Sequence, residues 1–240
     1  MPPLRVLITG VGGRIGRHVV PALREIYQLK TLDRVPTPVA PDAVITDLQD
    51  RDILRTTMEQ IDVVLHLAAT SDEAPFVEDL VPNNVIGVYN VFQAAYEAGV
   101  RRIVFASTVQ TVGMYPPDQT ITISDPVRPN TLYGATKVLG EVMGRWYHDA
   151  HGMEFVGIRI GWFHPYDSPA LRNHAGARSI WLSPRDAVRL FRCAIETPDV
   201  GYALVFGTSR TEFERLSLAP ARELLGYEPE DDVTRLYPGA

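Results

Sequence analysis

The sequence predicts an α/β fold in which helices cover both faces of a parallel sheet. Over the first two-thirds of the chain, short β-branched runs alternate with longer helical patterns, which is the spacing of strand–helix–strand units. The strand runs are mostly apolar along their length, as expected when both faces of a sheet are buried. A glycine-rich turn also follows the first run directly. These observations favour a doubly wound, Rossmann-type sheet.

Most elements can be assigned from these patterns. The expected strands are Leu4–Thr9, Leu29–Asp33, Ala43–Thr46, Asp62–Leu67, Arg102–Ala106, Phe155–Ile160 and Tyr202–Phe206. The expected helices are Gly13–Ile26, Arg51–Gln60, Leu80–Ala98, Thr131–His151, a helix opened by Ser183-Pro184, and Leu218–Leu225 ended by Gly226. Trp162–Ile180 has no clear period and is expected to be a long loop, and the acidic tail from Glu228 is expected to be loosely packed.

Composition narrows the functional classes. The 240 residues carry a net charge of −6, so no basic surface is expected for nucleic acid. The single cysteine excludes an internal disulfide framework, and no apolar run reaches the roughly 20 residues that span a bilayer. His148 and His151 share a helix face without a third ligand nearby, so no metal site is predicted. The expected location is the cytoplasm.

The turn after the first strand is typical of a phosphate-binding loop. Gly10, Gly13 and Gly16 follow the pattern G-x-x-G-x-x-G between a strand and a helix. Glycines permit the tight turn and let phosphate oxygens approach the backbone, and the helix directs its free N–H groups and dipole at the pyrophosphate. Glycines also make ordinary strand–helix turns, but the context favours a dinucleotide site.

Further residues extend this site along the sheet edge. Asp33 ends the second strand, where a carboxylate can accept hydrogen bonds from the adenosine ribose and repel the 2′-phosphate of NADP. The expected cofactor is therefore NAD, although Arg34 could soften the discrimination. Asp47 and Leu48 are expected to border the adenine, and the small residues of Leu67-Ala68-Ala69 would let the cofactor pass over the sheet.

A second motif supplies a candidate base. Tyr133 and Lys137 form Tyr-x-x-x-Lys near the start of a helix, which places them on one helical face. An ammonium near a phenol favours the phenolate and lowers the tyrosine pKa. The spacing alone is common by chance, but its place downstream of a dinucleotide turn favours a catalytic role.

Together these motifs resemble the extended branch of the short-chain dehydrogenase/reductase superfamily, the NAD-dependent epimerase/dehydratase family. The matching residues are Gly10, Gly13, Gly16, Asp33, Asp47, His66-Leu67-Ala68-Ala69, Asn84, Ser107-Thr108, Tyr133 and Lys137. The resemblance implies that Thr108 hydrogen-bonds the reacting oxygen and that Asn84 organises a proton-relay water beside the cofactor. It adds Arg14, Ile15 and Ile160 to the cofactor site. It also implies a homodimer through the helices Leu80–Ala98 and Thr131–His151.

Within this branch the chain looks most like uronate dehydrogenases and related NAD-dependent aldose dehydrogenases. The similarity rests on the runs 102–108, 132–134, 159–161 and 180–183. It implies oxidation of a sugar or sugar acid at C1 to a lactone by hydride transfer to NAD. That group typically has Asn-His after the catalytic Ser, whereas Val109-Gln110 stand here. Its carboxylate-binding arginine does not align cleanly, so Arg172 and Arg178 are both candidates.

The expected substrate-binding set is then Ser71, Thr108, Gln110, Tyr133, Arg172 and Arg178. Either arginine could instead simply solvate the loop. The expected organisation is one domain over residues 1–240, with a dinucleotide-binding core (1–160) and a substrate-covering portion (161–240). Two other functions remain open: an epimerase or dehydratase that returns the hydride it takes, and an NAD-sensing scaffold. The retained Tyr133 and Lys137 disfavour the scaffold.

Overall fold

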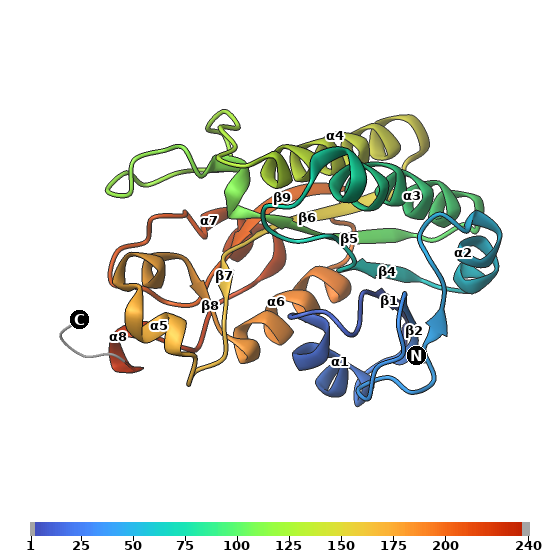
Figure 1. Ribbon diagram of the computed structural model, residues 1–240, viewed down its shortest axis with the longest axis horizontal. Helices are drawn as coiled ribbons and strands as arrows, with labels where there is room; N and C mark the ends of the chain where they lie inside the picture. The colour runs from blue at the N-terminus through green and yellow to red at the C-terminus, as the bar shows by residue number, and fades with distance from the viewer. Residues whose placement is uncertain (1–2, 237–240) are drawn as a thin grey trace.

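The computed structural model describes residues 3–236, which form a seven-stranded parallel sheet between two layers of helices (Figure 1). The strand order is β3-β2-β1-β4-β5-β6-β9, and every pairing is parallel. The strands are β1 (Arg5–Thr9), β2 (Gln28–Asp33), β3 (Val44–Ile45), β4 (Val63–His66), β5 (Arg102–Thr108), β6 (Glu154–Ile160) and β9 (Tyr202–Gly207). The predicted doubly wound α/β fold is therefore confirmed.

Helices α2, α3 and α4 lie on one side of the sheet, and α1 and α6 lie on the other (Figure 1). The helices are α1 (Gly16–Arg24), α2 (Arg51–Met58), α3 (Gly87–Glu97), α4 (Leu132–His151), α5 (Pro169–Asn173), α6 (Pro184–Glu196), α7 (Ala219–Leu225) and α8 (Val233–Leu236). Wider π-helical turns, η1 (Phe76–Ile86), precede α3, and a 3-10 turn, η2 (Val109–Val112), follows β5. No helix among residues 3–236 is long and apolar enough to cross a membrane.

The sheet separates two apolar cores, as the uninterrupted hydrophobic runs predict. In β1, Val6 and Ile8 pack in the core beneath α1 and α6, while Leu7 packs in the core beneath α3 and α4. All three side chains are fully buried. Successive strand residues point to opposite faces, so a strand covered on both sides must be apolar at every position.

The strand order reverses direction between β1 and β4, since β2 and β3 extend one way and β5, β6 and β9 the other. At such a switch point, loops leaving the carboxyl ends of adjacent strands diverge and open a crevice where ligands bind. The predicted glycine turn leaves β1 at this point, and the Leu67-Ala68-Ala69 run leaves β4 beside it. The topology therefore places the predicted cofactor site.

Several predicted boundaries differ from the structure by one to four residues. The helix expected from Gly13 begins at Gly16, because the preceding residues make the glycine turn. The helix expected from Leu80 begins earlier, at Phe76, with π-helical turns. Pro82 lies within these turns and has no N–H to donate, which disturbs the regular α-helical ladder. The strand expected to end at Ala106 runs on to Thr108.

The prediction of one long loop over Trp162–Ile180 is wrong. This segment contains the short strand β7 (Trp162–Phe163), α5 and the 3-10 turn η3 (Ala175–Ile180), and β7 pairs with β8 (Trp181–Leu182). Elements this short leave no periodicity in a sequence. The fully buried Trp181 anchors the segment, because its indole Nε1 donates to the carbonyl of His164 at 2.9 Å.

The prediction of a loosely packed tail from Glu228 is also wrong for its described part, up to residue 236. The backbone N–H groups of Glu230 and Asp231 donate to the carboxylate of Asp186 on α6. Asp231 in turn accepts a hydrogen bond from Ser183 at 2.5 Å, and Val233 is buried. The acidic residues are thus partners for α6 rather than a solvated run.

Candidate active site

The three glycines of the first turn have separate steric roles. Gly10 has φ +73°, and a Cβ there would lie 2.6 Å from the Ala68 backbone, so only glycine lets the β1 and β4 ends approach this closely. A Cβ on Gly16 would lie 2.5 Å from the Gly10 carbonyl oxygen, so α1 can pack against β1 only without one. A Cβ on Gly13 would meet only that carbonyl, at 3.1 Å, which leaves its outer side open to a ligand.

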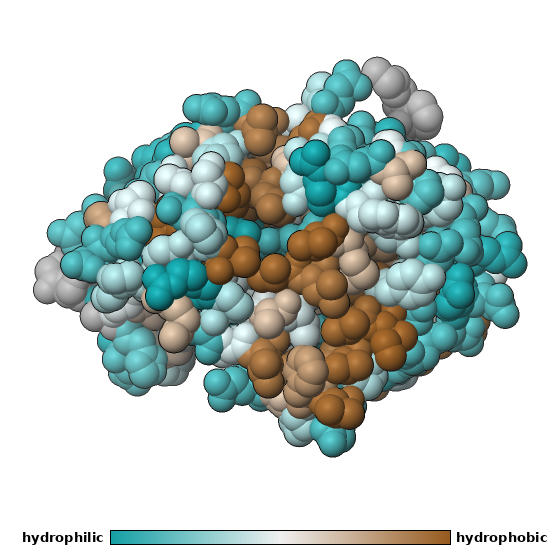
Figure 2. Space-filling model, turned by 90° about the horizontal axis from the view of Figure 1, so that it is seen from above, coloured by the Kyte–Doolittle hydropathy of each residue, from teal (hydrophilic) through white to brown (hydrophobic). Residues whose placement is uncertain are grey.

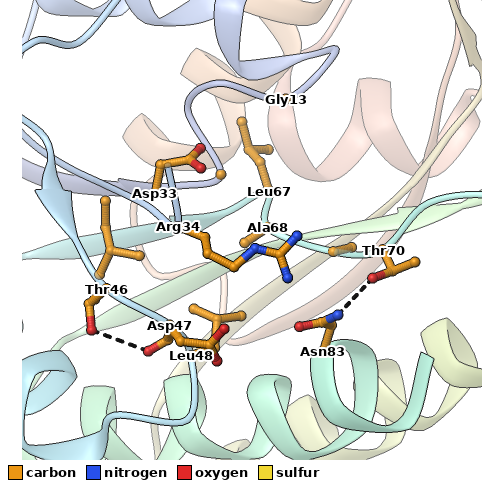
Figure 3. A pocket seen from close by; sticks show the side chains of 13 residues that line it. Gly13, Asp33, Arg34, Thr46, Asp47, Leu48, Leu67, Ala68, Thr70 and Asn83 are labelled. Carbon is orange, nitrogen blue, oxygen red and sulfur yellow. Dashed lines mark hydrogen bonds between the residues drawn. The ribbon is translucent and has the colours of Figure 1, made fainter. Parts of the chain in front are cut away.

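Asp33 braces this turn from the end of β2. Its Oδ2 accepts the Gly12 N–H at 2.8 Å, and its Oδ1 accepts the Val35 N–H at 3.2 Å. Figure 3 shows Asp33 at the wall of a cavity, with the Arg34 guanidinium extending across it. The carboxylate keeps lone pairs for ribose hydroxyls, while the position of Arg34 offers some counter-charge to a phosphate.

The cavity beside Asp33 contains most of the predicted cofactor residues. Its lining comprises Gly10, Gly13, Leu32, Asp33, Arg34, Thr46, Asp47, Leu48, Leu67, Ala68, Ala69, Thr70 and Asn83. Two carboxylates, small apolar residues and an open glycine backbone suit an adenosine and the start of a diphosphate. The residues present therefore fit the adenosine half of a dinucleotide.

A second cavity continues from the first, and the two share Gly10, Gly13, Leu67 and Ala69. The other predicted site residues that line it are Arg14, Ile15, Gly16, Ser71, Thr108, Gln110, Tyr133, Lys137 and Ile160. Asp72, Glu73, Asn130, Thr131 and Trp162 also line it. Candidate dinucleotide-binding residues and candidate catalytic residues thus line adjoining cavities at the switch point.

The start of α4 fixes Tyr133 against the end of β5. The N-cap Thr131 accepts the Gly134 N–H at 2.9 Å and donates to Gln110 Oε1 at 2.6 Å. A Cβ on Gly134 would lie 2.7 Å from the Gln110 carbonyl oxygen, so the first turn of α4 rests directly on η2. Because Thr131 donates to the side-chain oxygen Oε1 of Gln110, the side-chain NH₂ group of Gln110 keeps its N–H donors for a ligand.

Lys137 lies beneath Tyr133 and is 1% exposed. Its Nζ donates to the Ala106 carbonyl at 2.9 Å and lies 5.7 Å from the Tyr133 ring centroid. Burial lowers the pKa of Lys137 to about 7, and the nearby Glu141 carboxylate opposes this shift. Burial raises the pKa of Tyr133, Asp72 raises it further, and Arg14 lowers it. Desolvation therefore outweighs the lowering that the Tyr-x-x-x-Lys spacing predicts.

A buried hydrogen-bond network below the site engages one of the two hydroxyl groups at the end of β5. Ser107 Oγ donates to Glu141 Oε1 at 2.6 Å, and Arg159 makes two hydrogen bonds to the same carboxylate, at 3.0 and 2.8 Å. Thr108 is the next residue along the strand, and it lines the same cavity as Tyr133. Its Oγ1 accepts the Gln110 N–H at 3.2 Å and retains an O–H to donate.

Three predicted site residues lie outside both cavities. Asn84 is fully buried, where its amide donates to the Thr70 carbonyl and Thr136 Oγ1 and accepts the Thr70 N–H. It braces the loop after β4, and its role with a relay water stays a prediction. Arg172 is exposed on α5, and Arg178 donates to the carbonyls of Leu171 and Arg172 at that helix end.

Sequence reasoning missed several residues at this site. Asn83 lines the first cavity and donates to Thr70 Oγ1 at 2.8 Å, whereas only its neighbour was chosen (Figure 3). The Glu141–Arg159 pair was also missed. Glu141 lies four residues after Lys137, so the helical period could have indicated a carboxylate on the same face. No sequence motif includes Asp72, so its place at the cavity could be found only from the fold.

This fold and site define an NAD-dependent oxidoreductase. The profile of the NAD dependent epimerase/dehydratase family matches residues 6–166. An NAD-dependent glucose-6-phosphate dehydrogenase of Haloferax volcanii is 35% identical over 248 residues, covering 95% of this chain and 93% of the relative. An L-arabinose 1-dehydrogenase (NAD(P)⁺) of the same organism is 34% identical, with 95% and 97% covered.

Solved structures agree with these sequence relatives. A uronate dehydrogenase from Agrobacterium tumefaciens, complexed with NAD, superimposes with a TM-score of 0.84 and 31% identity, covering 97% of this chain and 86% of that one. The chain therefore belongs to the NAD-dependent epimerase/dehydratase family, as its motifs predict. It is an enzyme of the dehydrogenase group, and NAD is its cofactor.

Proposed function

We propose that the chain is an aldose 1-dehydrogenase, which oxidises a free sugar or sugar acid at C1 to a lactone. The observation that carries this proposal is the continuity of the two cavities. Tyr133 and Thr108 face the same space as the glycine turn and Asp33, so a sugar and a dinucleotide can meet there. The dehydrogenases that resemble the chain act on three different aldoses by name, which supports aldose chemistry without selecting the sugar.

In the proposed mechanism the chain's residues handle the proton and the orientation. The Thr108 hydroxyl donates a hydrogen bond to the oxygen on C1 of the sugar. Tyr133 Oη, as the phenolate, takes the proton of the C1 hydroxyl. Lys137, held by the Ala106 carbonyl, supplies a charge below the ring, and Gln110 donates to a neighbouring sugar hydroxyl. Bound NAD supplies the two-electron acceptor.

The covering portion of the chain also favours a small substrate. Residues 161–236 add β9 to the main sheet and place Trp162, Gly161 and Ile180 at the cavity wall. We propose that residues 1–160 bind the cofactor and residues 161–240 cover a free sugar, as parts of one domain. A sugar-nucleotide epimerase or dehydratase remains the alternative function.

A substrate panel read at the NADH absorbance tests this proposal. Glucose, galactose, arabinose, glucuronate, galacturonate and glucose-6-phosphate should be offered with NAD. We expect net NADH from at least one of them. If none reduces NAD while a nucleotide sugar is epimerised or dehydrated without net NADH, the epimerase alternative replaces the proposal.

We further propose that the enzyme is a homodimer. The face formed by α3 and α4 bears a band of hydrophobic surface (Figure 2). At the end of η1 and along α3 and α4, the exposed apolar residues are Ile86, Tyr89, Tyr96, Leu132, Leu139, Val142 and Trp146. Contiguous apolar patches of this kind mark protein interfaces, and a second copy can bury the same helices. Sedimentation velocity should give the dimer mass, and a monomer at micromolar concentration would contradict it. The expected cytoplasmic location stays a prediction.

A further inference from the structure

The cationic side chains that line the catalytic cavity, among residues 3–236, are Arg14 and Lys137. Lys137 is buried, and its ammonium binds the Ala106 carbonyl beneath the tyrosine. Arg14 differs because its side chain is 54% exposed and reaches the cavity from the glycine turn. Its Nη2 lies 3.3 Å from Asp72 Oδ2, and Asp72 is 56% exposed.

This ion pair spans the crevice at the switch point. Arg14 lies in the glycine turn between β1 and α1, while Asp72 belongs to the connection between β4 and η1. Arg14 lowers the pKa of Tyr133 and also that of His164, which directly follows β7. Its charge therefore lies within electrostatic reach of both the reacting phenol and the covering segment.

We infer that Arg14 binds the anionic group, carboxylate or phosphate, of an acidic aldose whose C1 lies at Tyr133, and that this group replaces Asp72. The inference rests on the proposed aldose oxidation. Asp72 engages one guanidinium nitrogen, so further N–H donors remain for a second oxygen. Arginine binds planar or phosphate oxyanions in two-pronged geometry, and a half-exposed ion pair is weak enough to exchange.

The loop arginines that the sequence suggested do not fill this role. Neither Arg172 nor Arg178 lines the catalytic cavity. The Arg178 guanidinium donates to the carbonyls of Leu171 and Arg172, where it closes the end of α5. Arg14 lines this cavity, so it can reach an anionic substituent of a bound sugar where neither loop arginine can.

Three single variants test this inference: Arg14→Gln, Asp72→Asn and, as a control outside the cavity, Arg172→Gln. For each protein, kcat/KM is measured with glucuronate, galacturonate and glucose-6-phosphate, and with glucose and galactose. The readout is kcat/KM for the anionic sugar divided by kcat/KM for the neutral sugar. A change in the pKa of Tyr133 affects both values equally and cancels in this ratio. The acidic sugars separate carboxylate from phosphate recognition.

In the wild-type enzyme we expect kcat/KM to be higher for an acidic aldose than for its neutral counterpart. Arg14→Gln should lower the ratio about tenfold or more, since a cation is lost from the anion. Asp72→Asn should raise the ratio because the competing carboxylate is gone, and Arg172→Gln should leave it unchanged.

Several results would overturn the inference. These are a ratio unchanged by Arg14→Gln, a loss confined to the KM for NAD, a loss in Arg172→Gln, or oxidation of neutral sugars only. Each of them leaves aldose oxidation standing. Failure of every sugar in the wild-type enzyme would instead refute the proposed function itself.

Discussion

The floor and the rim of the catalytic cavity are built from ion pairs of opposite character. On the floor, Glu141 and Arg159 are 4% and 3% exposed. The Glu141 carboxylate accepts two hydrogen bonds from Arg159 and one from Ser107. On the rim, Arg14 and Asp72 are both more than half exposed and meet through one contact. The floor cannot change partners without burying an unpaired charge, whereas the rim can. The floor thus holds a fixed ion pair, and the rim holds one that can exchange partners.

The largest effect is expected at Tyr133, which lies between the floor and the rim. Tyr133→Phe keeps the ring but removes the proposed proton acceptor, so kcat should fall by about two to four orders of magnitude. NAD binding, followed by fluorescence titration, should change little. Tyr115→Phe is the control, because Tyr115 hydrogen-bonds the Pro126 carbonyl away from the cavity. Near-normal turnover of Tyr133→Phe would refute the assignment.

The floor should be sensitive in stability. Glu141→Gln leaves the Arg159 guanidinium buried without its carboxylate, and should lower the free energy of unfolding by about 3–5 kcal/mol. Denaturant titration measures this change. Asp149→Asn, on the same helix, breaks the exposed pair with Arg145 and should leave the unfolding midpoint unchanged. Equal losses in the two variants would erase the distinction between the buried and exposed pairs.

Cofactor choice tests a charge that is half-buried, at Asp33. Asp33→Ser removes the carboxylate that would repel a 2′-phosphate, while Arg34 remains across the cavity. The NAD preference over NADP should therefore narrow or invert, as measured by kcat/KM for each cofactor. Arg34→Gln, the matched variant, should weaken only NADP. Tighter NADP binding by the wild-type enzyme would contradict this account of Asp33.

The smallest effects are expected in the pH profile. Burial raises the pKa of Tyr133, so kcat/KM should increase with pH as the deprotonated base becomes more abundant. Arg14 lowers this pKa, so Arg14→Gln should move the rising limb to higher pH. Asp72 raises it, so Asp72→Asn should move the limb to lower pH. Shifts in the same direction would show that the rim does not act on the tyrosine through charge.

The sequence predicts the sheet well because most of its strands are apolar on both faces. The two motifs also locate the cofactor turn and Tyr133, because helical and turn spacing are local properties. Local patterns could not indicate the short elements of residues 162–182, which are held by distant contacts such as Trp181 with His164.

Side-chain partners were harder to predict than positions. The Asp186 carboxylate joins α6 to the acidic tail by accepting two backbone N–H groups, 44 and 45 residues away. No local sequence pattern predicts a pairing over that separation. Arg172 and Arg178 looked suitable for an anion by charge and loop position. The fold instead turns Arg178 toward helix carbonyls, and it brings Arg14 to the cavity from the other end of the chain.

The most direct test of the central claim follows a deuterium atom from C1. An aldose labelled with deuterium at C1 is incubated with NAD and the enzyme, and the reduced cofactor is analysed by mass spectrometry. Oxidation at C1 predicts one deuterium in each NADH and a lactone without the label. Unlabelled NADH, or a sugar that keeps its C1 deuterium while another carbon is changed, would contradict the account.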